Sequence, residues 1–416
     1  MTRQRVFDGV SRVAIDGRAI SHPQPGGFKT YSENLVKHLP QLDDSVNYEI
    51  LLDRPVAKQT IPSRPNVAVS VIPNTLPVLG VPFRENVALP WHLLRSAVDL
   101  VHFPNASAAL WSPRAFVITI HDAMELMPVS AHYGGASVKR NLMHLYNRFN
   151  QTWAARRAEA IITVSQCSKL DIMRCLKVPE AKIHVTYEAP VEAFTQIRDE
   201  ELLCQVRQKY GLAANFILGI GSADPRKNIT SLVRAYSQLP ADLVTRYQLA
   251  IVLTHRRFEE SLQALAKTLG VADRVRYLSA VPTVDLARLY SAAALFVFPS
   301  LYEGFGLPPL EAMACGVPVV AANNSSISEI LGDAARFVLD VDPAGDQAGF
   351  TWMINRVLND PEGRRAMSQD GLQRARLFSW ERCARETLAV YGRVIESRHQ
   401  SPAYQRGLAS KDHPVR

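Results

Sequence analysis

The sequence predicts an α/β protein made of two doubly wound domains that face each other across a cleft. Short runs rich in β-branched residues alternate with amphipathic stretches of helical spacing along the whole chain. This alternation is typical of parallel sheets with helices on both faces. The chain has 416 residues, too many for one ordinary core, so two domains of about 200 residues are the natural division.

The β-branched runs give the expected strands in order. Those of the first half are 13–16, 48–52, 67–72, 99–103, 116–120, 160–164 and 183–187. Those of the second half are 216–220, 248–253, 275–278, 294–298, 317–321 and 337–339. Each is short and apolar enough to be a strand buried on both faces.

The domain boundaries follow from breaks in this pattern. Residues 188–198 contain a proline and mix polar with apolar residues, so we expect the linker there. The predicted units are residues 1–190, residues 191–378, a terminal helix over 379–398 and a mobile tail over 399–416. Ser379 is a good N-cap, and the helix after it has an apolar stripe: Trp380, Ala384, Leu388, Tyr391 and Ile395.

Composition narrows the class of protein. Hydrophobic residues make up 47 %, charged residues 21 %, and the mean hydropathy is −0.05. No apolar run approaches the ~18 residues of a membrane-spanning helix, and the polar, basic residues 1–11 do not resemble a secretion signal. The five cysteines form no C-x-x-C pair. We expect them to be reduced core residues of a cytoplasmic protein, with no disulfide and no metal site.

The positive charge is spread along the chain. The net charge is +8, and each half, 1–200 and 201–416, carries +4. This disfavours a nucleic-acid-binding arm and remains compatible with an anionic substrate or an acidic membrane surface. The densest basic stretch is 139–157, where apolar residues recur at helical spacing: Leu142, Leu145, Phe149 and Trp153. We expect these to face the core, with membrane contact as the weaker alternative.

Residues 302–312, YEGFGLPPLEA, are the most informative segment. Glu303 and Glu311 lie eight positions apart, separated by two glycines and two prolines. Proline suits the first turn of a helix, so we expect a helix from about Pro308 to Gly316. A helix start offers free N–H groups to phosphate oxygens, and carboxylates accept hydrogen bonds from hydroxyls. The combination favours a sugar nucleotide, although the glycines could also serve a plain turn and Glu311 could merely complement the helix dipole.

The second half opens with an apolar strand that runs into a glycine turn and then Arg226 and Lys227. In open α/β sheets, ligands bind beyond the carboxyl ends of the strands. Two adjacent cations there can neutralise a diphosphate. The dinucleotide fingerprint is not met, because Asp224 stands where the third glycine is needed, and a solvated basic turn is the alternative.

Two further features lie in the first half. Gly26 and Gly27 precede residues 30–33, which have capping-box spacing, and could approach the same diphosphate from the opposite wall. His121 and Asp122 end the strand 116–120, again on the cleft side. A metal-dependent hydrolase would need further ligands that we cannot assemble, and the G-x-S-x-G and H-E-x-x-H motifs are absent.

Taken together and in this order, these motifs resemble the retaining glycosyltransferases of family 4, also called glycosyl transferases group 1, with the two-domain GT-B architecture. The resemblance rests on E-x7-E at Glu303 and Glu311, on Arg226-Lys227, on the glycine loop, on His121-Asp122, and on AIITVSQCS at 160–168. It covers roughly residues 12–398 and includes a terminal helix that returns toward the N-terminal domain.

The resemblance implies a role for each motif residue. Arg226 and Lys227 would hold the donor diphosphate, Glu311 the ribose hydroxyls, and Gly27 would close on the diphosphate from the N-terminal domain. Glu303 would grip the donor sugar together with the amides of Phe305, Gly306 and Leu307. His121 would face the sugar near its reacting carbon. It also implies a retaining hexosyltransferase that needs neither a metal ion nor another cofactor.

The opening stretch, VAIDGR followed by GGFKTYSEN, is similar to the bacterial mannosyltransferases that build O-antigen and other surface polysaccharides. GDP-mannose is therefore the first expectation for the donor, ahead of UDP-sugars, and a glycan or lipid-linked oligosaccharide is the expected acceptor. The expected location is cytoplasmic, with peripheral contact to the inner membrane face left open. A nucleotide-sugar 2-epimerase and a non-catalytic sugar-nucleotide-binding subunit are the alternatives. Acceptor, linkage and oligomeric state are not readable, and the segments 73–84 and 131–137 depart from the family pattern.

Overall fold

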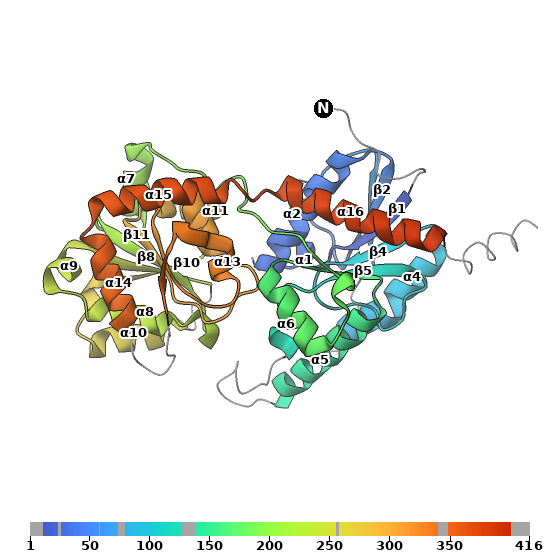
Figure 1. Cartoon of the computed structure of the whole chain (residues 1–416), viewed down its shortest axis with the longest axis horizontal. Coiled ribbons are helices and arrows are strands. Elements are labelled where there is room, and N and C mark those ends of the chain that lie inside the picture. Colours follow the sequence, from blue (N-terminus) through green and yellow to red (C-terminus); the bar gives the residue numbers. More distant parts are fainter. Residues whose placement is uncertain are drawn as a thin grey trace, which may run out of the picture.

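The computed structural model of the chain describes residues 11–23, 26–57, 59–73, 80–126, 138–254, 258–339 and 348–400. The predicted tail beyond residue 400, residues 131–137 and residues 74–79 of the segment 73–84 therefore lie outside the described residues. The strands form two parallel sheets, one on each side of the molecule (Figure 1).

The N-terminal sheet has seven strands in the order β3-β2-β1-β4-β5-β6-β7. They are β1 Ser11–Asp16, β2 Val46–Leu52, β3 Val67–Val71, β4 Leu100–Phe103, β5 Ala115–Thr119, β6 Ala160–Thr163 and β7 Ile183–Val185. Ile15 of β1 stands in register with Ile50 on one side and His102 on the other. The strand order reverses between β1 and β4, which marks the switch point where such sheets bind ligands.

The C-terminal sheet has six strands in the order β10-β9-β8-β11-β12-β13. They are β8 Phe216–Gly221, β9 Gln248–Leu253, β10 Val275–Ser279, β11 Leu295–Phe298, β12 Val319–Ala322 and β13 Arg336–Val338. Its order reverses between β8 and β11. All the expected strands are present in the two sheets, with ends moved by two residues or fewer. Most of them are buried and apolar along their length, whereas the edge strand β3 is largely exposed.

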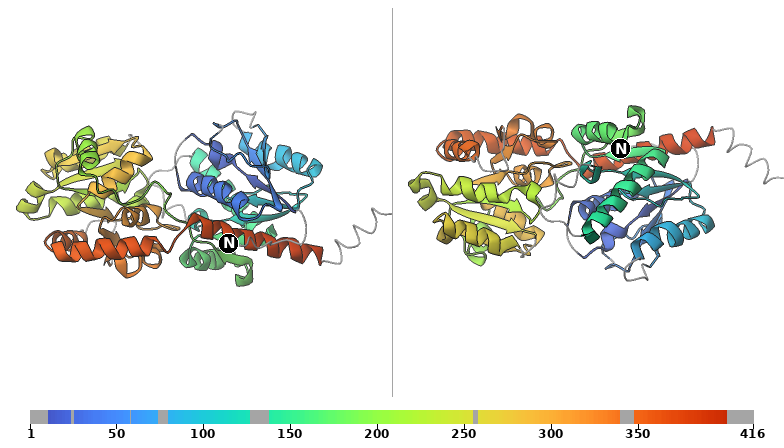
Figure 2. Two further views of the ribbon diagram at one scale, coloured as in Figure 1. Left: turned by 90° about the horizontal axis from the view of Figure 1, so that it is seen from above. Right: turned by 90° about the horizontal axis from the view of Figure 1, so that it is seen from below.

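Helices cover both sheets (Figure 2). Those up to the mid-chain crossing are α1 Arg18–Ser21, α2 Gly27–Leu42, α3 Gly80–Phe83, α4 Leu89–Arg95, α5 Val138–Arg157 and α6 Gln166–Leu176. Those after it are α7 Glu200–Lys209, α8 Ile229–Ser237, α9 Ala241–Arg246, α10 Glu259–Thr268, α11 Thr283–Ala292, α12 Leu307–Ala314, α13 Ile327–Leu331, α14 Ala348–Leu358, α15 Pro361–Ala375 and α16 Trp380–His399. Short turns of other helical type include η1 Arg84–Ala88, η2 Met124–Leu126, η4 Glu180–Lys182, η5 Pro225–Lys227, η7 Ala272–Arg274 and η8 Gly332–Ala334.

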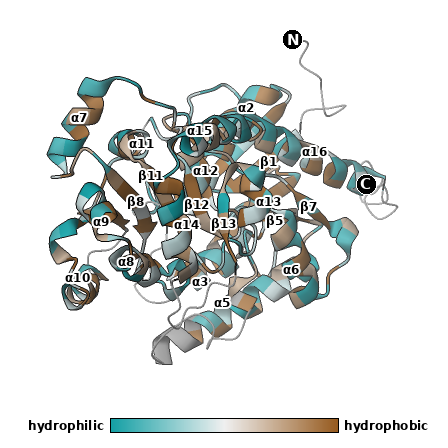
Figure 3. Cartoon of the chain, turned by 60° about the vertical axis from the view of Figure 1, so that its left-hand side comes forward, coloured by the Kyte–Doolittle hydropathy of each residue, from teal (hydrophilic) through white to brown (hydrophobic). Residues whose placement is uncertain are grey.

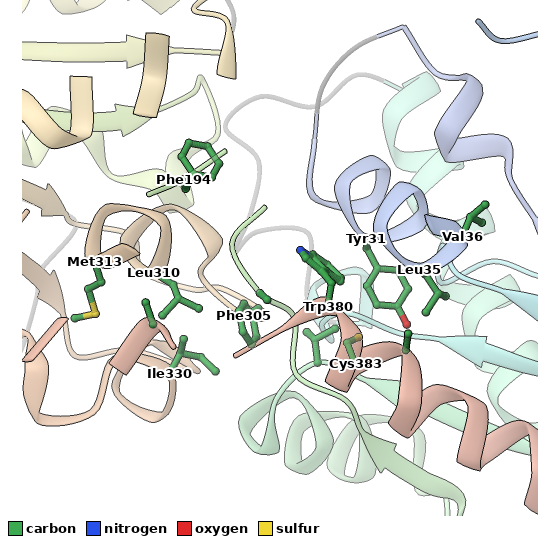
Figure 4. Packing of buried hydrophobic residues seen from close by; sticks show 14 of the residues in the cluster. Tyr31, Leu35, Val36, Phe194, Phe305, Leu310, Met313, Ile330, Trp380 and Cys383 are labelled. Atoms are coloured by element: carbon green, nitrogen blue, oxygen red, sulfur yellow. The ribbon is translucent and has the colours of Figure 1, made fainter. Parts of the chain in front are cut away.

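Helix α16 crosses back from the C-terminal domain and packs on the N-terminal one (Figure 1). Ser379 caps it by accepting from the Arg382 amide at 3.2 Å, and all five predicted stripe residues are buried. The Trp380 ring lies 6.1 Å from the ring of Tyr31 in α2. Figure 4 shows this contact inside an apolar cluster that reaches Phe305 of the other domain. The last helix therefore ties the two domains into one core.

The structure corrects the expected orientation of the helix over 139–157. Leu142, Leu145, Phe149 and Trp153 are 63 %, 62 %, 53 % and 41 % exposed, so they face solvent and not the core. Polar side chains such as that of Asn150 take the inward positions because they hydrogen-bond to main-chain groups beneath the helix.

Two smaller expectations also need correction. Helix α2 begins at Gly27, so Thr30 and Glu33 lie inside it and form no capping box, and Thr30 already donates its amide to the Gly26 carbonyl at 3.0 Å. All five cysteines are free, but only Cys315 and Cys383 are core residues, because the other three retain exposed surface.

Candidate active site

The turn after β8 presents the predicted cation pair at the switch point of the C-terminal sheet. Asp224 caps this turn by accepting from the Arg226 amide at 3.0 Å. The same carboxylate accepts from the Arg226 guanidinium, at 3.0 Å from Nε and 2.6 Å from Nη2. Burial alone would lower the pKa of Arg226, but the Asp224 carboxylate outweighs it and raises the pKa. Asp224 therefore holds Arg226 charged and in a fixed orientation.

Lys227 points to the neighbouring turn, which follows β11. Its Nζ lies 2.6 Å from Oε1 of Glu303, and the Ser300 hydroxyl donates to the same oxygen at 2.6 Å. The side chains of Lys227 and Glu303 are 25 % and 12 % exposed. A lysine ammonium has three donor positions, so this pair leaves others free for a ligand. The sequence-predicted cation and carboxylate thus lie together.

The loop 304–306 leads from Glu303 into α12 and contains two glycines that sterics require. Gly306 has φ of +98°, and a Cβ there would lie 2.5 Å from Ile327. A Cβ on Gly304 would lie 2.4 Å from the main-chain oxygen of His121 in the other domain. Both positions therefore need glycine.

Helix α12 begins at Leu307, one residue from the expected start, and Gly306 supplies no side-chain cap. Within the described part of the chain, the amides of Phe305, Gly306 and Leu307 donate no hydrogen bond to another group of the protein. These N–H groups stand at the positive end of the helix dipole, next to Glu303, and form an anion-binding corner.

Glu311 lies in the second turn of α12. The Tyr290 hydroxyl donates to its Oε2 at 3.3 Å. Burial of the carboxyl group, with a smaller contribution from Glu188, raises the pKa of Glu311 to about 7. The residue as a whole keeps some exposed surface, so a hydroxyl group of a ligand can approach it.

His121 ends up at the domain boundary, as the sequence predicted, but its ring is turned inward. Nδ1 lies 3.1 Å from the Glu188 carboxylate and Nε2 lies 3.0 Å from the Pro104 carbonyl oxygen. His121 is 8 % exposed, and its ring packs edge-on against those of Phe28 and Tyr31, with ring centroids 4.8 and 4.7 Å apart. Both ring nitrogens therefore face oxygen acceptors of the protein.

Gly27 opens α2 beside Phe28, whose ring contacts His121. A Cβ on Gly27 would meet no atom within 4 Å, so this glycine is not required by packing. Its position at the helix start leaves room for close approach by a ligand.

Sequence reasoning missed the contacts that hold the two domains together. Glu329 of α13 accepts from the amides of Gln166 and Cys167 at the start of α6, at 2.7 and 2.9 Å, and from the Tyr187 hydroxyl at 2.9 Å. Ser165 and Ser168 donate to the Gly304 carbonyl at 2.7 and 3.1 Å. In the sequence, the one indication of these contacts was Ser165, which lies in the AIITVSQCS segment and is the N-cap of α6.

A second bridge starts from Tyr302, which precedes Glu303. Its hydroxyl donates to Asp171 of α6 at 3.0 Å. The donor-side loop is thus bound to the N-terminal domain on both sides of Glu303.

Two family models match this chain, one in each half. The family model described as Glycosyltransferase Family 4 matches residues 25–189, and the one described as Glycosyl transferases group 1 matches residues 205–374. The two matches follow one another in the two domains.

The chain belongs to the group 1 glycosyltransferases of family 4. Among curated relatives of this glycosyltransferase, the O-antigen chain mannosyltransferase B of Escherichia coli is 41 % identical over 236 residues, 56 % of this chain and 60 % of that protein. The serotype-specific mannosyltransferase WbdA of Escherichia coli is 30 % identical over 299 residues, 70 % of this chain and 35 % of that protein. The matches therefore span only part of these relatives.

Solved structures share the fold of this glycosyltransferase. Sucrose-phosphate synthase from Thermosynechococcus elongatus superposes with a TM-score of 0.72 at 21 % identity, covering 93 % of this chain and 100 % of that one. WaaG, a glycosyltransferase involved in lipopolysaccharide biosynthesis, gives 0.70 at 16 % identity over 91 % and 99 %. The architecture is GT-B, as the sequence predicted.

Proposed function

We propose that this glycosyltransferase moves a mannosyl group from GDP-mannose to a glycan or lipid-linked oligosaccharide acceptor of a surface polysaccharide, on the cytoplasmic side of the membrane. The observation that carries the proposal is the pairing of Lys227 with Glu303 beside the free amides of residues 305–307 at the start of α12. Cations and amides suit a diphosphate, and the carboxylate suits sugar hydroxyls. The names of the curated relatives, an O-antigen chain mannosyltransferase and a serotype-specific mannosyltransferase, support mannose as the transferred sugar.

In the proposed reaction, the bond between the anomeric carbon and the diphosphate oxygen breaks and its electron pair stays on the leaving nucleoside diphosphate. Arg226 and Lys227 stabilise this growing negative charge, which is the interaction that must strengthen toward the transition state. The acceptor hydroxyl attacks from the same face, and its proton passes to a leaving phosphate oxygen. The configuration of the sugar is therefore retained.

Within this scheme Glu303 positions the sugar and forms no covalent adduct, while Glu311 accepts from the ribose hydroxyls. His121 stays a predicted contact of the donor sugar, with Glu188 fixing its ring. Gly27 is proposed to close on the diphosphate. We propose that the protein's cations do the work that a divalent metal does elsewhere.

The test combines binding with turnover. A thermal-shift panel of GDP-, UDP- and ADP-sugars should give the largest shift with GDP-mannose, because a bound donor stabilises the folded state by mass action. Product analysis should show α- or β-configuration preserved from the donor, and transfer should persist in EDTA. One structural neighbour, HepE of Anabaena, was solved with UDP and glucose. A larger shift with a UDP-sugar would reassign the donor of this chain. Release of the nucleoside diphosphate without any acceptor, with the 2-epimer of the donor sugar as product, would favour an epimerase instead.

A further inference from the structure

Helix α5 is folded with its polar side inward. Asn150 is fully buried and exchanges two hydrogen bonds with the main chain of Ala108, at 2.9 and 3.0 Å. Tyr146 donates to the Glu85 carboxylate at 3.1 Å. Gln151 is buried as well, followed by the small residues Ala154 and Ala155. Because these polar bonds are specific, the helix cannot rotate to bury its apolar side without breaking them.

The outward side of α5 carries the apolar stripe Leu142, Leu145, Phe149 and Trp153, which we call the α5 face. Its members recur every three or four positions, and the rings of Phe149 and Trp153 stack with centroids 6.3 Å apart. The Trp153 indole N–H donates to the Leu110 carbonyl at 2.8 Å. The ring can therefore enter an apolar medium without leaving an unpaired donor. Helix α5 runs along the outer edge of the molecule (Figure 3).

A second exposed stripe lies next to the α5 face. The Leu110 amide donates to Asn86 at 2.9 Å, which links the loop under Trp153 to η1. The stripe runs from the end of α3 through η1 into α4 and consists of Phe83, Val87, Trp91 and Leu94, all at least 39 % exposed. Trp111, in the linking loop, is 52 % exposed. Apolar side chains thus continue from one helix to the next.

This region also holds most of the net charge of the chain. Residues 80–95, 104–115 and 138–157 contain eight Lys or Arg against one Glu, a net charge of +7, while the whole chain carries +8. The one acid, Glu85, is 1 % exposed and paired with Arg18, and one of the cations, Arg84, is fully buried against Asp16. Arg148, Arg156 and Arg157 are exposed on α5 itself. The outward surface therefore presents cations and no carboxylate from these segments.

The charge decides which partner fits. A second copy of the chain would bring the same cations against these, since α5 contains no Asp or Glu, and like charges repel at such a contact. An anionic lipid surface complements them, and it accepts Trp, Phe and Leu at the boundary between headgroups and acyl chains. We propose that the α5 face and its arginines dock this glycosyltransferase on an anionic phospholipid bilayer.

This inference rests on the proposed function at the cytoplasmic membrane, where a lipid-linked acceptor would be presented, and names the surface involved. Its test uses no donor and no acceptor. If vesicle binding fails while GDP-mannose still binds in solution, only the docking inference falls. None of the helices in the described part of the chain is long and apolar enough to cross a membrane.

Co-sedimentation with vesicles tests the docking. The full chain should bind phosphatidylethanolamine vesicles that contain phosphatidylglycerol and should not bind pure phosphatidylcholine. Replacing Arg148, Arg156 and Arg157 by Gln should weaken binding on the order of a hundredfold, since each cation near the surface contributes. The triple variant Leu142→Ser, Leu145→Ser and Phe149→Ser should weaken it at least tenfold, and its melting temperature should stay unchanged because these side chains are exposed.

Trp352→Ser is the matched control. Trp352 in α14 is 55 % exposed and lies under the Arg356 guanidinium at 5.2 Å, so it offers the same residue types on the other domain. It should bind vesicles like the wild type. Equal binding to anionic and neutral vesicles, or an equal loss in the control, would overturn the proposal. The proposal would also be overturned if the wild type forms a dimer in analytical ultracentrifugation and the triple variant Leu142→Ser, Leu145→Ser and Phe149→Ser is a monomer.

Discussion

Lys227 and Glu303 form an ion pair, 2.6 Å between Nζ and Oε1, although 76 positions separate them in the chain. Each follows one of the two strands, β8 and β11, between which the sheet order reverses. Because adjacent parallel strands end at the same edge, the turns that carry the two residues meet. The ion pair lies at the base of the proposed donor site, and each of its two side chains holds the other in position.

The first prediction assigns different effects to the two residues of this ion pair: Lys227 on nucleotide binding and Glu303 on turnover. Lys227→Ala removes a charge-assisted contact to the diphosphate and should weaken GDP binding roughly 10- to 100-fold in calorimetry. Glu303→Gln keeps the shape and should leave GDP affinity within about threefold, while kcat falls roughly 10²- to 10³-fold. Glu381→Gln, an exposed carboxylate on α16, is the control. A covalent glycosyl adduct at Glu303, detected by mass spectrometry, would contradict the positioning role.

The second prediction concerns Asp224, which orients Arg226 without reaching the ligand in our proposal. Asp224→Asn keeps the cap on the Arg226 amide but loses the charge that fixes the guanidinium. We expect GDP affinity to fall about tenfold, and addition of Arg226→Ala should cost little more, because both act through one group. Fully additive losses in the double variant would show that Asp224 acts independently.

The third prediction is a pH dependence at Glu311. Its carboxyl group ionises with a pKa of 4.5 in the ordinary case and about 7 in the folded protein. As pH rises from 4.5 to 7, the unfolded chain loses this proton first, so the free energy of unfolding falls, by at most about 3 kcal/mol. Glu311→Gln should remove that fall, so the variant should match the wild type near pH 4.5 and be the more stable at pH 8.

The same ionisation should act on the donor. A carboxylate accepts hydrogen bonds from ribose hydroxyls better than a carboxylic acid does, so donor affinity should rise as pH passes through 7. Calorimetric titrations of wild type and Glu311→Gln between pH 6 and 8 would check this. A parallel pH dependence in both proteins would remove Glu311 from the ribose site.

The fold was predictable because its signals are local. All strands were found from runs that are apolar on both faces, and Ser379 revealed the start of α16 through its N-cap chemistry. The orientation of α5 was not predictable. Its stripe of Leu142, Leu145, Phe149 and Trp153 has the spacing of a core-facing helix, and only tertiary hydrogen bonds such as that of Asn150 to Ala108 reverse it.

The candidate site was predictable in part for the same reason. Glu303, Lys227 and Gly306 can be recognised in the sequence because they are charged residues or a glycine within short motifs. Partners such as Asp224 and Glu329 were missed, because Asp224 looked like a failed glycine position and Glu329 bonds a helix 162 positions away. Contacts between domains do not produce a periodic pattern of residues, so the sequence alone does not reveal them.

The fourth prediction concerns the bridge between the domains. Glu329 places a carboxylate on the positive end of α6, where two amides and the Tyr187 hydroxyl bind it. Glu329→Ala should lower stability by about 1–2 kcal/mol and allow the domains to separate, seen as a larger radius of gyration in X-ray scattering. Arg198→Ala serves as a surface control in the crossing segment. Unchanged scattering would mean that the contacts of Tyr302 and Gly304 suffice.

The last prediction compares two glycines that face the same boundary for different reasons. At Gly304 a Cβ would lie 2.4 Å from the His121 carbonyl oxygen, which is main chain and cannot yield. Gly304→Ala should therefore push the domains apart, lower the melting temperature and cut turnover at least tenfold. At Gly27 a Cβ meets no atom within 4 Å, so Gly27→Ala should fold with unchanged stability. If Gly27 closes on the diphosphate, that variant should still lose donor affinity, since a methyl group would occupy the space of the ligand. Equal donor affinity in Gly27→Ala and wild type would show that this helix start does not touch the diphosphate, whereas a melting temperature unchanged in Gly304→Ala would mean that the two domains do not need the close contact.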